Sequence, residues 1–151
     1  MVLLVTDEGF GLPLTALLRA ARKTMVRSIR STLEEAGYED LPANGPYVLS
    51  ATTVAGVPLA VIIERLGLSK QAAGHLVDLL VLRGYLDRQV DPEDRRRLVV
   101  VPTERGVAAA LVINKAGSLV ESRLAAEVGH SDLQATRRTL ASLAAMGNDI
   151  A

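Results

Sequence analysis

Two short segments of helical periodicity, joined by one tight turn, constrain the fold of this chain most strongly. Pro58 is placed to open a helix that runs to Leu66, and Gly67 ends it. Ser69 is a favourable N-cap for a second helix, for which Gly84 is a favourable C-cap. Two short helices separated by so tight a glycine turn are predicted to form a helix-turn-helix.

The pattern changes directly after the second helix. Residues 85–90 alternate loosely, residues 91–94 read Asp-Pro-Glu-Asp, which is typical of a turn, and residues 97–101 are rich in valine. We therefore predict a β-hairpin over 85–102. A helix-turn-helix followed by such a hairpin is a winged helix, so the predicted fold class is mainly α (α+β), with a two-stranded wing.

Further helices are predicted on both sides of this unit. Apolar residues recur at spacings of three and four between Pro13 and Gly37, and a short helix is expected from Tyr47 to Thr53. A turn is expected at 55–57. Five basic residues of the first helix lie off its apolar stripe, where a solvated face is the ordinary interpretation: Arg19, Arg22, Lys23, Arg27 and Arg30.

Two helices are predicted after the wing, a long one over 104–128 and a last one over 132–146. Ser131 and Gln134 have the spacing of a capping box for the last helix. The long helix would span about 37 Å and is apolar around much of its circumference. Because a compact winged helix cannot cover that surface, we predict a homodimer built from the two ends of the chain.

The predicted organisation has three parts. Residues 1–37 and 104–151 form the dimerisation region, and residues 38–103 form the winged-helix domain, with a recognition helix at about 69–83 and a wing at about 85–102. The length of 151 residues suits one compact domain with helical extensions.

Composition excludes several classes of function. The 17 Lys and Arg residues balance 17 Asp and Glu residues, so the chain is not coated in positive charge, although a local basic patch is compatible with this balance. The absence of Cys excludes disulfides, thiolate metal ligands and cysteine nucleophiles. The longest apolar run, 107–113, is too short for a membrane span. We expect a soluble, cytoplasmic protein with no membrane partner.

Nothing in the chain has the pattern of a catalytic, metal or cofactor site. The two histidines, His75 and His130, are far apart and have no partner at ligand spacing. Gly9-Phe10-Gly11 matches only half of a dinucleotide-binding fingerprint. We therefore expect no metal, no cofactor and no enzymatic activity.

The second helix of the helix-turn-helix has two distinct faces. One face is apolar and is expected to point inward: Ala73, Leu76, Val77 and Leu80. The other is small and polar and can enter a DNA major groove: Gln71, Gly74, His75 and Asp78. Ser69, Lys70 and the N-terminus of the helix can bind a phosphate. The alternative is an ordinary solvated face.

The tip of the hairpin is rich in arginine. Arg95, Arg96 and Arg97 follow the turn, and Arg88 lies on the facing strand. A guanidinium group on such a tip can enter a narrow minor groove, where the potential is most negative. The alternative is a loop neutralised by the neighbouring acidic residues: Asp91, Glu93 and Asp94.

The stretch 62–106 resembles the MarR family of bacterial transcription regulators. Four pieces carry the resemblance: SKQ with a following LVD, RGYLDR, DPEDRR, and a strand that ends in T-E-R-G. The resemblance implies a homodimer that binds pseudo-palindromic double-stranded DNA as a transcriptional regulator, most often a repressor. It also implies release by a small aromatic or phenolic ligand. Such a ligand would lie between the first helix, the segment around Tyr47 and the start of the long helix.

Carried over by position, the resemblance assigns roles to individual residues. Four residues would face the groove or its phosphates: Ser69, Lys70, Gln71 and His75. Arg96 would enter the minor groove, with Arg95 and Arg97 beside it and Asp94 as its orienting partner. The chain departs from the family where hydroxyl and guanidinium groups are replaced, at Ala72, Gly74 and His75. Gly74 suggests close approach of the backbone to DNA.

A second function is kept as an alternative. Leu79 and Val81 occupy places that are usually polar in the family. With the balanced charge and the missing hydroxyls, they favour a winged helix used for protein–protein interaction, with weak or no specific DNA binding.

Overall fold

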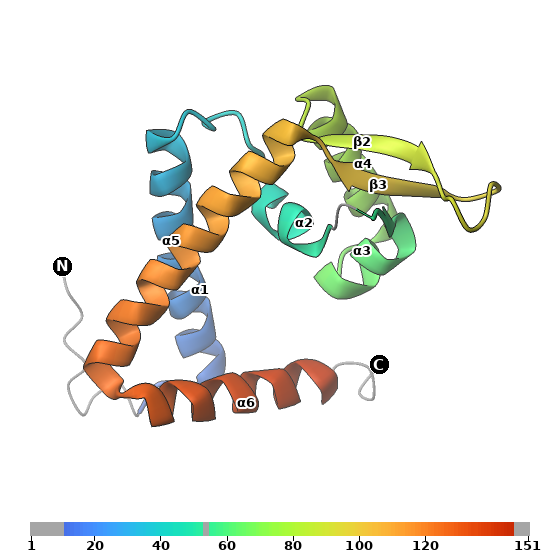
Figure 1. Cartoon of the computed structure of the whole chain (residues 1–151). Helices are drawn as coiled ribbons and strands as arrows, with labels where there is room; N and C mark the ends of the chain where they lie inside the picture. Colours follow the sequence, from blue (N-terminus) through green and yellow to red (C-terminus); the bar gives the residue numbers. More distant parts are fainter. Residues whose placement is uncertain (1–10, 53–54, 147–151) are drawn as a thin grey trace.

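The computed structural model describes residues 11–52 and 55–146 (Figure 1). The elements follow in the order α1 (Leu14–Glu35), α2 (Gly45–Ala51), β1 (Val57–Pro58), α3 (Leu59–Leu66), α4 (Lys70–Leu82), β2 (Leu86–Val90), β3 (Leu98–Pro102), α5 (Glu104–Val128) and α6 (His130–Met146). None of the helices in these two ranges is long and apolar enough to cross a membrane. The winged helix-turn-helix is thus formed by α3, α4 and the β2–β3 hairpin.

Local capping signals determine the helix-turn-helix as predicted. Gly67 takes the left-handed conformation, with φ 59°, and ends α3. The Ser69 hydroxyl accepts a hydrogen bond from the backbone N–H of Ala72 at 3.2 Å and begins α4. Gly84, with φ 72°, follows the last turn of α4, and the N–H of Tyr85 donates to the carbonyl of Leu80 at 2.9 Å.

The sheet has three strands, not the two that were predicted. Its order is β1-β3-β2, and both pairings are antiparallel. Val57 pairs with Val100 and Pro58 with Val99, where the sequence suggested a turn followed directly by a helix. Gly56 permits this close approach, because a Cβ atom there would lie 2.7 Å from Cγ2 of Val99. Strand β1 could not be predicted from the sequence, because a strand of two residues has no recognisable periodicity.

One continuous core joins the winged helix to the flanking helices. The largest fully buried side chains come from four elements and the residue before β2: Tyr85, Ile62, Leu80, Leu86, Val48 and Val77. Leu33 of α1 and Ile113 of α5 belong to the same cluster. The predicted inward stripe of α4 is confirmed, since Ala73, Leu76, Val77 and Leu80 are all buried.

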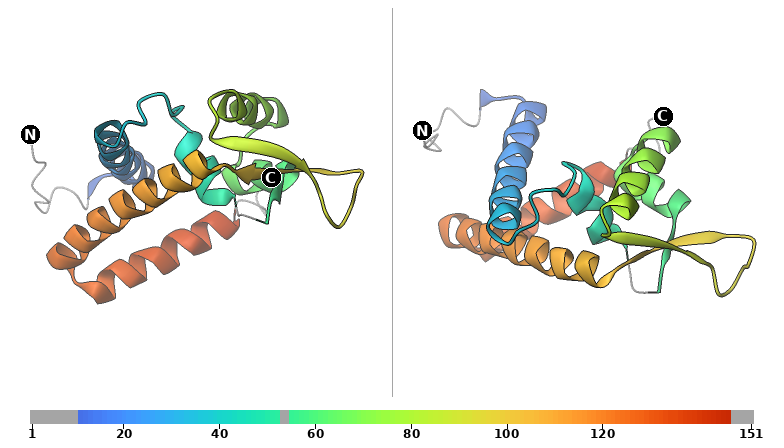
Figure 2. Two further views of the ribbon diagram at one scale, coloured as in Figure 1. Left: turned by 45° about the horizontal axis from the view of Figure 1, so that its top comes forward. Right: turned by 90° about the horizontal axis from the view of Figure 1, so that it is seen from above.

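The remaining helices form an arm that extends away from the wing (Figures 1 and 2). Helix α1 packs on α5, and α6 folds back from the far end of α5. The predicted capping box is wrong, because α6 begins at His130, where Ser131 already lies within the first turn. The carbonyl of Gly129 accepts from Leu133 N–H at 3.2 Å. Helix α2 begins at Gly45, before the predicted start at Tyr47, and Thr53 lies outside the described residues.

Candidate nucleic-acid interface

The outer face of α4 is open and polar. Ser69, Lys70, Gln71 and His75 are all exposed, Ser69 and Lys70 at the N-terminal end of α4 and Gln71 and His75 on the side opposite its buried stripe. A Cβ atom placed on Gly74 would meet nothing within 4 Å, so no packing within the described chain requires glycine there. The structure therefore brings the predicted groove-facing residues together on one accessible surface.

The wing tip is organised around a single buried carboxylate, Asp91. Its Oδ1 accepts from Glu93 N–H at 2.9 Å, while its Oδ2 accepts from Nη2 of Arg97 at 2.8 Å and from Nε at 3.1 Å. The backbone bond from Glu93, followed by the Arg97 guanidinium, lowers the pKa of the Asp91 carboxyl below its ordinary value. The carboxylate thus holds the turn closed in its charged form.

This geometry corrects the role that the sequence suggested for Asp94. Its Oδ1 accepts the backbone N–H of Arg96 at 3.0 Å, so it fixes the backbone of the tip instead of the Arg96 guanidinium. The carboxylate that orients an arginine side chain is Asp91, and that arginine is Arg97. Arg95 and Arg96 are exposed, and neither forms an ion pair in the part of the chain described.

Arg88 does not lie free beside the other wing arginines. Its Nη2 pairs with Oδ1 of Asp78 on α4, although both side chains keep substantial exposure, 40% and 60%. This ion pair ties strand β2 to the polar face of α4. The wing and the recognition helix are therefore linked through their side chains as well as through the core.

A polar junction behind α4 joins three segments that are distant in sequence. The Tyr85 hydroxyl donates to Oδ1 of Asp40 at 2.5 Å, and Arg105 Nη2 donates to the same oxygen at 2.9 Å. Arg105 also lies 4.3 Å from the centre of the Tyr85 ring and donates to the carbonyl of Arg83 at 2.6 Å. Arg83 in turn donates to the Asp40 carbonyl. The junction connects the loop before α2, the end of α4 and the start of α5.

Electrostatics and close packing both support this junction. The hydrogen bond from Tyr85, with the Arg105 charge, lowers the pKa of Asp40, while desolvation and the Asp40 carboxylate raise the pKa of Tyr85. A Cβ atom on Gly106 would lie 2.0 Å from the Tyr85 carbonyl oxygen, so α5 begins in direct contact with the backbone before β2. Sequence reasoning missed this cluster, because Asp40 lies in a loop with no motif.

The apolar residues that favoured a protein-interaction surface are placed differently from expectation. Leu79 and Val81 are half-buried, and Val81 packs against the core. The exposed apolar residue of α4 is Leu82, at 82% exposure. The apolar surface on this helix therefore lies at its C-terminal end, away from the Ser69 end.

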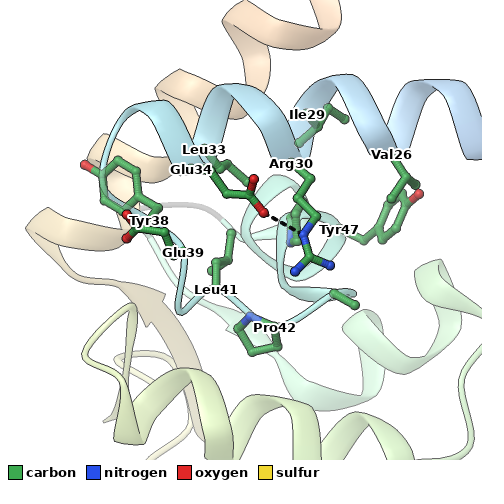
Figure 3. A pocket seen from close by; sticks show the side chains of 12 residues that line it. Val26, Ile29, Arg30, Leu33, Glu34, Tyr38, Glu39, Leu41, Pro42 and Tyr47 are labelled. Carbon is green, nitrogen blue, oxygen red and sulfur yellow. Dashed lines mark hydrogen bonds and ion pairs between the residues drawn. The ribbon is translucent and has the colours of Figure 1, made fainter.

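A small pocket lies between α1 and the segment that leads into α2 (Figure 3). Apolar walls come from Val26, Ile29, Leu33 and Leu41, and Tyr38 and Tyr47 lie at opposite ends of it. Its volume is about 50 Å³. This pocket is thus lined by α1 and the segment around Tyr47, two of the three walls expected for a ligand cleft, and the start of α5 does not line it.

Together, the helix-turn-helix, the arginine-rich wing and the open polar face of α4 define a winged-helix DNA-binding protein. Comparison with known proteins agrees with this class. The model of the MarR family matches residues 40–97. No curated protein sequence matches the chain.

Solved structures extend the similarity over nearly the whole chain. CouR from Rhodococcus jostii RHA1, in a crystal structure bound to p-coumaroyl-CoA, is 25% identical with a TM-score of 0.73, covering 95% of this chain and 96% of its own. MepR of S. aureus in complex with DNA is 18% identical with a TM-score of 0.71, covering 87% and 96%. Apo MarR from E. coli is 21% identical with a TM-score of 0.64, covering 87% and 97%. Residues 40–97 thus match the MarR family, and the chain as a whole has the fold of these regulators.

Proposed function

We propose that this protein is a repressor that binds a pseudo-palindromic operator as a homodimer. The observation that carries the proposal is the pairing of two surfaces on one rigid unit: the exposed polar face of α4 and the exposed Arg95–Arg96 tip. The Arg88–Asp78 ion pair connects these two surfaces. Ser69, Lys70, Gln71 and His75 would meet a major groove and its phosphates, while Arg96 would reach the adjacent minor groove.

Homodimer formation is supported by apolar surface on the arm. Helix α6 has no buried residue, although it carries apolar side chains. Exposed large apolar residues are concentrated on the arm: Leu12, Leu14 and Leu17 on or beside α1; Val107, Leu111, Leu119, Leu124 and Val128 on α5; and Leu140, Leu143 and Met146 on α6. A second copy of the chain would cover this surface. Two recognition helices would then sit about 34 Å apart, one turn of DNA.

The test is binding of the purified protein to the DNA upstream of its own gene, followed by fluorescence anisotropy. With roughly five phosphate contacts from each protomer, the logarithm of affinity should fall with the logarithm of salt at a slope near −9. Scrambled DNA of the same length is the comparison. Equal binding to both sequences would contradict an operator at this site.

Arg96→Ala tests the wing directly. Loss of a minor-groove guanidinium is expected to weaken operator binding by about tenfold or more, with no change in the melting temperature, because Arg96 forms no ion pair in the described part of the chain. Arg138→Ala on α6 is the matched control for loss of one exposed charge. Unchanged affinity of Arg96→Ala for every DNA would show that the wing does not bind DNA.

A ligand that releases the protein from DNA forms part of the proposal. The pocket beside α1 supports it, because its wall at Tyr38–Leu41 includes the loop that carries Asp40. Through Asp40, that loop contacts Arg83 at the end of α4 and Arg105 at the start of α5. An occupant that moves the loop would therefore change the position of the recognition helix.

The second candidate function is a winged helix that binds another protein. Its one specific support is Leu82, whose 82% exposure leaves an apolar side chain in solvent at the end of α4. Leu82→Lys separates the two functions. A DNA-binding repressor should keep its operator affinity, whereas a protein-binding module should lose its partner and show only sequence-independent DNA affinity.

A further inference from the structure

The polar face of α4 carries one acidic residue. Asp78 is the only Asp or Glu between Lys70 and Leu82, and its side chain is exposed. It lies three residues after His75 and seven after Gln71, so it shares their face of the helix. Because phosphates repel a carboxylate, Asp78 as a bare charge would oppose the DNA binding for which this face is placed.

Asp78 is paired with an arginine of the wing. Strand β2 packs beside α4 (Figure 1), and Nη2 of Arg88 donates to Oδ1 of Asp78. Both side chains remain exposed to solvent, so the ion pair lies at the surface of the winged helix. The Arg88 guanidinium is thus already bound to the protein at a place where a DNA phosphate would otherwise attract it.

The lysine and arginine residues of α4 and the wing fall into two groups. Those of the first group form no ion pair in the part of the chain described: Lys70, Arg95 and Arg96. In the second group each cation is held by a carboxylate, Arg97 by Asp91 and Arg88 by Asp78. The Asp91 pair closes the turn of the wing, because Asp91 also binds the backbone there. The Asp78 pair instead connects two separate elements.

Binding to arbitrary DNA and binding to an operator depend on different contacts. The first depends mainly on the number of phosphates that the protein neutralises, whereas the second adds contacts with base edges and with groove shape. A free Arg88 guanidinium would reach a phosphate at any register along the DNA. Held by Asp78, it makes no such contact, and it keeps the wing aligned with α4 instead. The ion pair therefore weakens binding to arbitrary DNA more than binding to an operator.

We infer that Asp78 is a specificity-determining residue, which limits sequence-independent DNA binding because it holds Arg88 away from phosphate. Arg88 is then a positioning residue, which aligns the wing with the polar face of α4 and adds no phosphate contact of its own. This inference rests on the proposed repressor function and names the residue pair that separates an operator from other DNA. Its effect on scrambled DNA can be measured even where no operator is known.

The first experiment is fluorescence anisotropy on scrambled DNA across a salt series, with Asp78→Asn and the unchanged protein. The variant frees one guanidinium in each protomer. Its affinity should rise at least fivefold at about 0.1 M salt, and the salt slope should steepen by about 0.9 for each protomer. An ion pair that only stabilised the fold would leave this affinity unchanged. No gain for scrambled DNA in Asp78→Asn would overturn the inference.

Two further variants assign the gain to Arg88. Asp78→Asn with Arg88→Gln should return the affinity for scrambled DNA and the salt slope to those of the unchanged protein. Asp87→Asn is the matched control, because it removes the same charge from the neighbouring position of β2. There the carboxylate accepts the backbone N–H of Arg88 at 2.8 Å and forms no ion pair in the described part of the chain. A gain that persisted in the double variant, or an equal gain in Asp87→Asn, would overturn the inference.

Binding to the DNA upstream of the gene, measured in parallel, separates this inference from the proposed function. The unchanged protein should prefer this DNA to scrambled DNA, and Asp78→Asn should reduce the ratio of the two affinities by about threefold or more. A ratio unchanged by Asp78→Asn would overturn the role in specificity. If the unchanged protein showed no preference, the repressor proposal would fail, whereas the salt slopes on scrambled DNA would still decide whether Asp78 holds Arg88 away from phosphate.

Discussion

At the scale of single residues, the wing depends on one carboxylate. Asp91 binds both the backbone of the turn and the Arg97 side chain, and only 8% of its side chain is exposed. Because its pKa is lowered in the folded state, its stabilising contribution is complete above the ordinary Asp pKa of about 3.9. That contribution is lost as the pH falls through the lower, folded-state pKa.

Asp91→Asn should therefore show a pH-dependent deficit. The amide keeps an acceptor for Glu93 N–H but loses the charge that holds Arg97, so operator affinity is expected to fall severalfold at neutral pH. Thermal unfolding of both proteins from pH 7 down to pH 3 provides the measurement, and the stability difference should shrink at the acid end. A difference that stays constant over this range would contradict the assigned role.

Gly74 gives a second prediction at this scale. Its added methyl group would meet nothing within the described chain, so Gly74→Ala should raise the unfolding free energy by up to about 1 kcal/mol through helix propensity. Operator affinity should nevertheless fall, because the methyl group would obstruct close approach of DNA to α4. Chemical denaturation and anisotropy on the same preparations test both parts. If Gly74→Ala were more stable than the unchanged protein and bound DNA with the same affinity, Gly74 would have no role in DNA binding.

At the scale of elements, the junction of Asp40, Arg83, Tyr85 and Arg105 determines how α4 meets α5. It satisfies carbonyl groups at the end of α4 and anchors the loop before α2. Its members lie outside the polar face of α4. Their effect on DNA binding is therefore expected to act through the position of the recognition helix.

Arg105→Gln tests this effect. It removes an ion pair with Asp40, in which both side chains are partly exposed, and a cation–π contact with the buried ring of Tyr85, so a loss of about 1–2 kcal/mol in unfolding free energy is expected. Operator affinity should also fall, at temperatures where the variant is fully folded. Arg123→Gln, an exposed cation on the same helix, is the control. Unchanged operator affinity would show that the junction only stabilises the fold.

At the scale of the whole molecule, the proposed homodimer depends on the apolar surface of the arm. Leu140 and Leu143 of α6 are 39% and 41% exposed and contribute nothing to the buried core. Leu140→Glu with Leu143→Glu should therefore preserve the fold of each chain but weaken the dimer. Loss of two buried leucines costs roughly 3–6 kcal/mol, or on the order of 10²- to 10⁴-fold in the dimer dissociation constant.

Sedimentation velocity over a dilution series measures this change. Arg138→Glu, at an exposed position on the opposite face of the same helix, is the matched control. Operator affinity should fall together with dimer stability, since each protomer holds only one recognition helix. A dissociation constant unchanged in the leucine variant would place the dimer interface elsewhere.

Features that depend on residues close together in the sequence could be predicted from the sequence alone. The caps at Ser69 and Thr103, the buried stripe of α4 and the bounds of the wing are local, because each depends on residues within one or two turns. The polar face of α4 and the exposure of Arg96 could be predicted for the same reason, because they too depend on nearby residues. These local features were sufficient to predict the winged helix and its candidate DNA-binding residues.

Pairings between distant segments were decided only by the tertiary structure. Strand β1 exists because Val57 meets Val100, and the Asp40 junction exists because the core brings residues 40, 85 and 105 together. The pairing of Arg88 with Asp78, and the use of Asp91 in place of Asp94, also follow from packing geometry. A sequence shows which charges are available, but the partner of each charge depends on distances that only the folded core establishes.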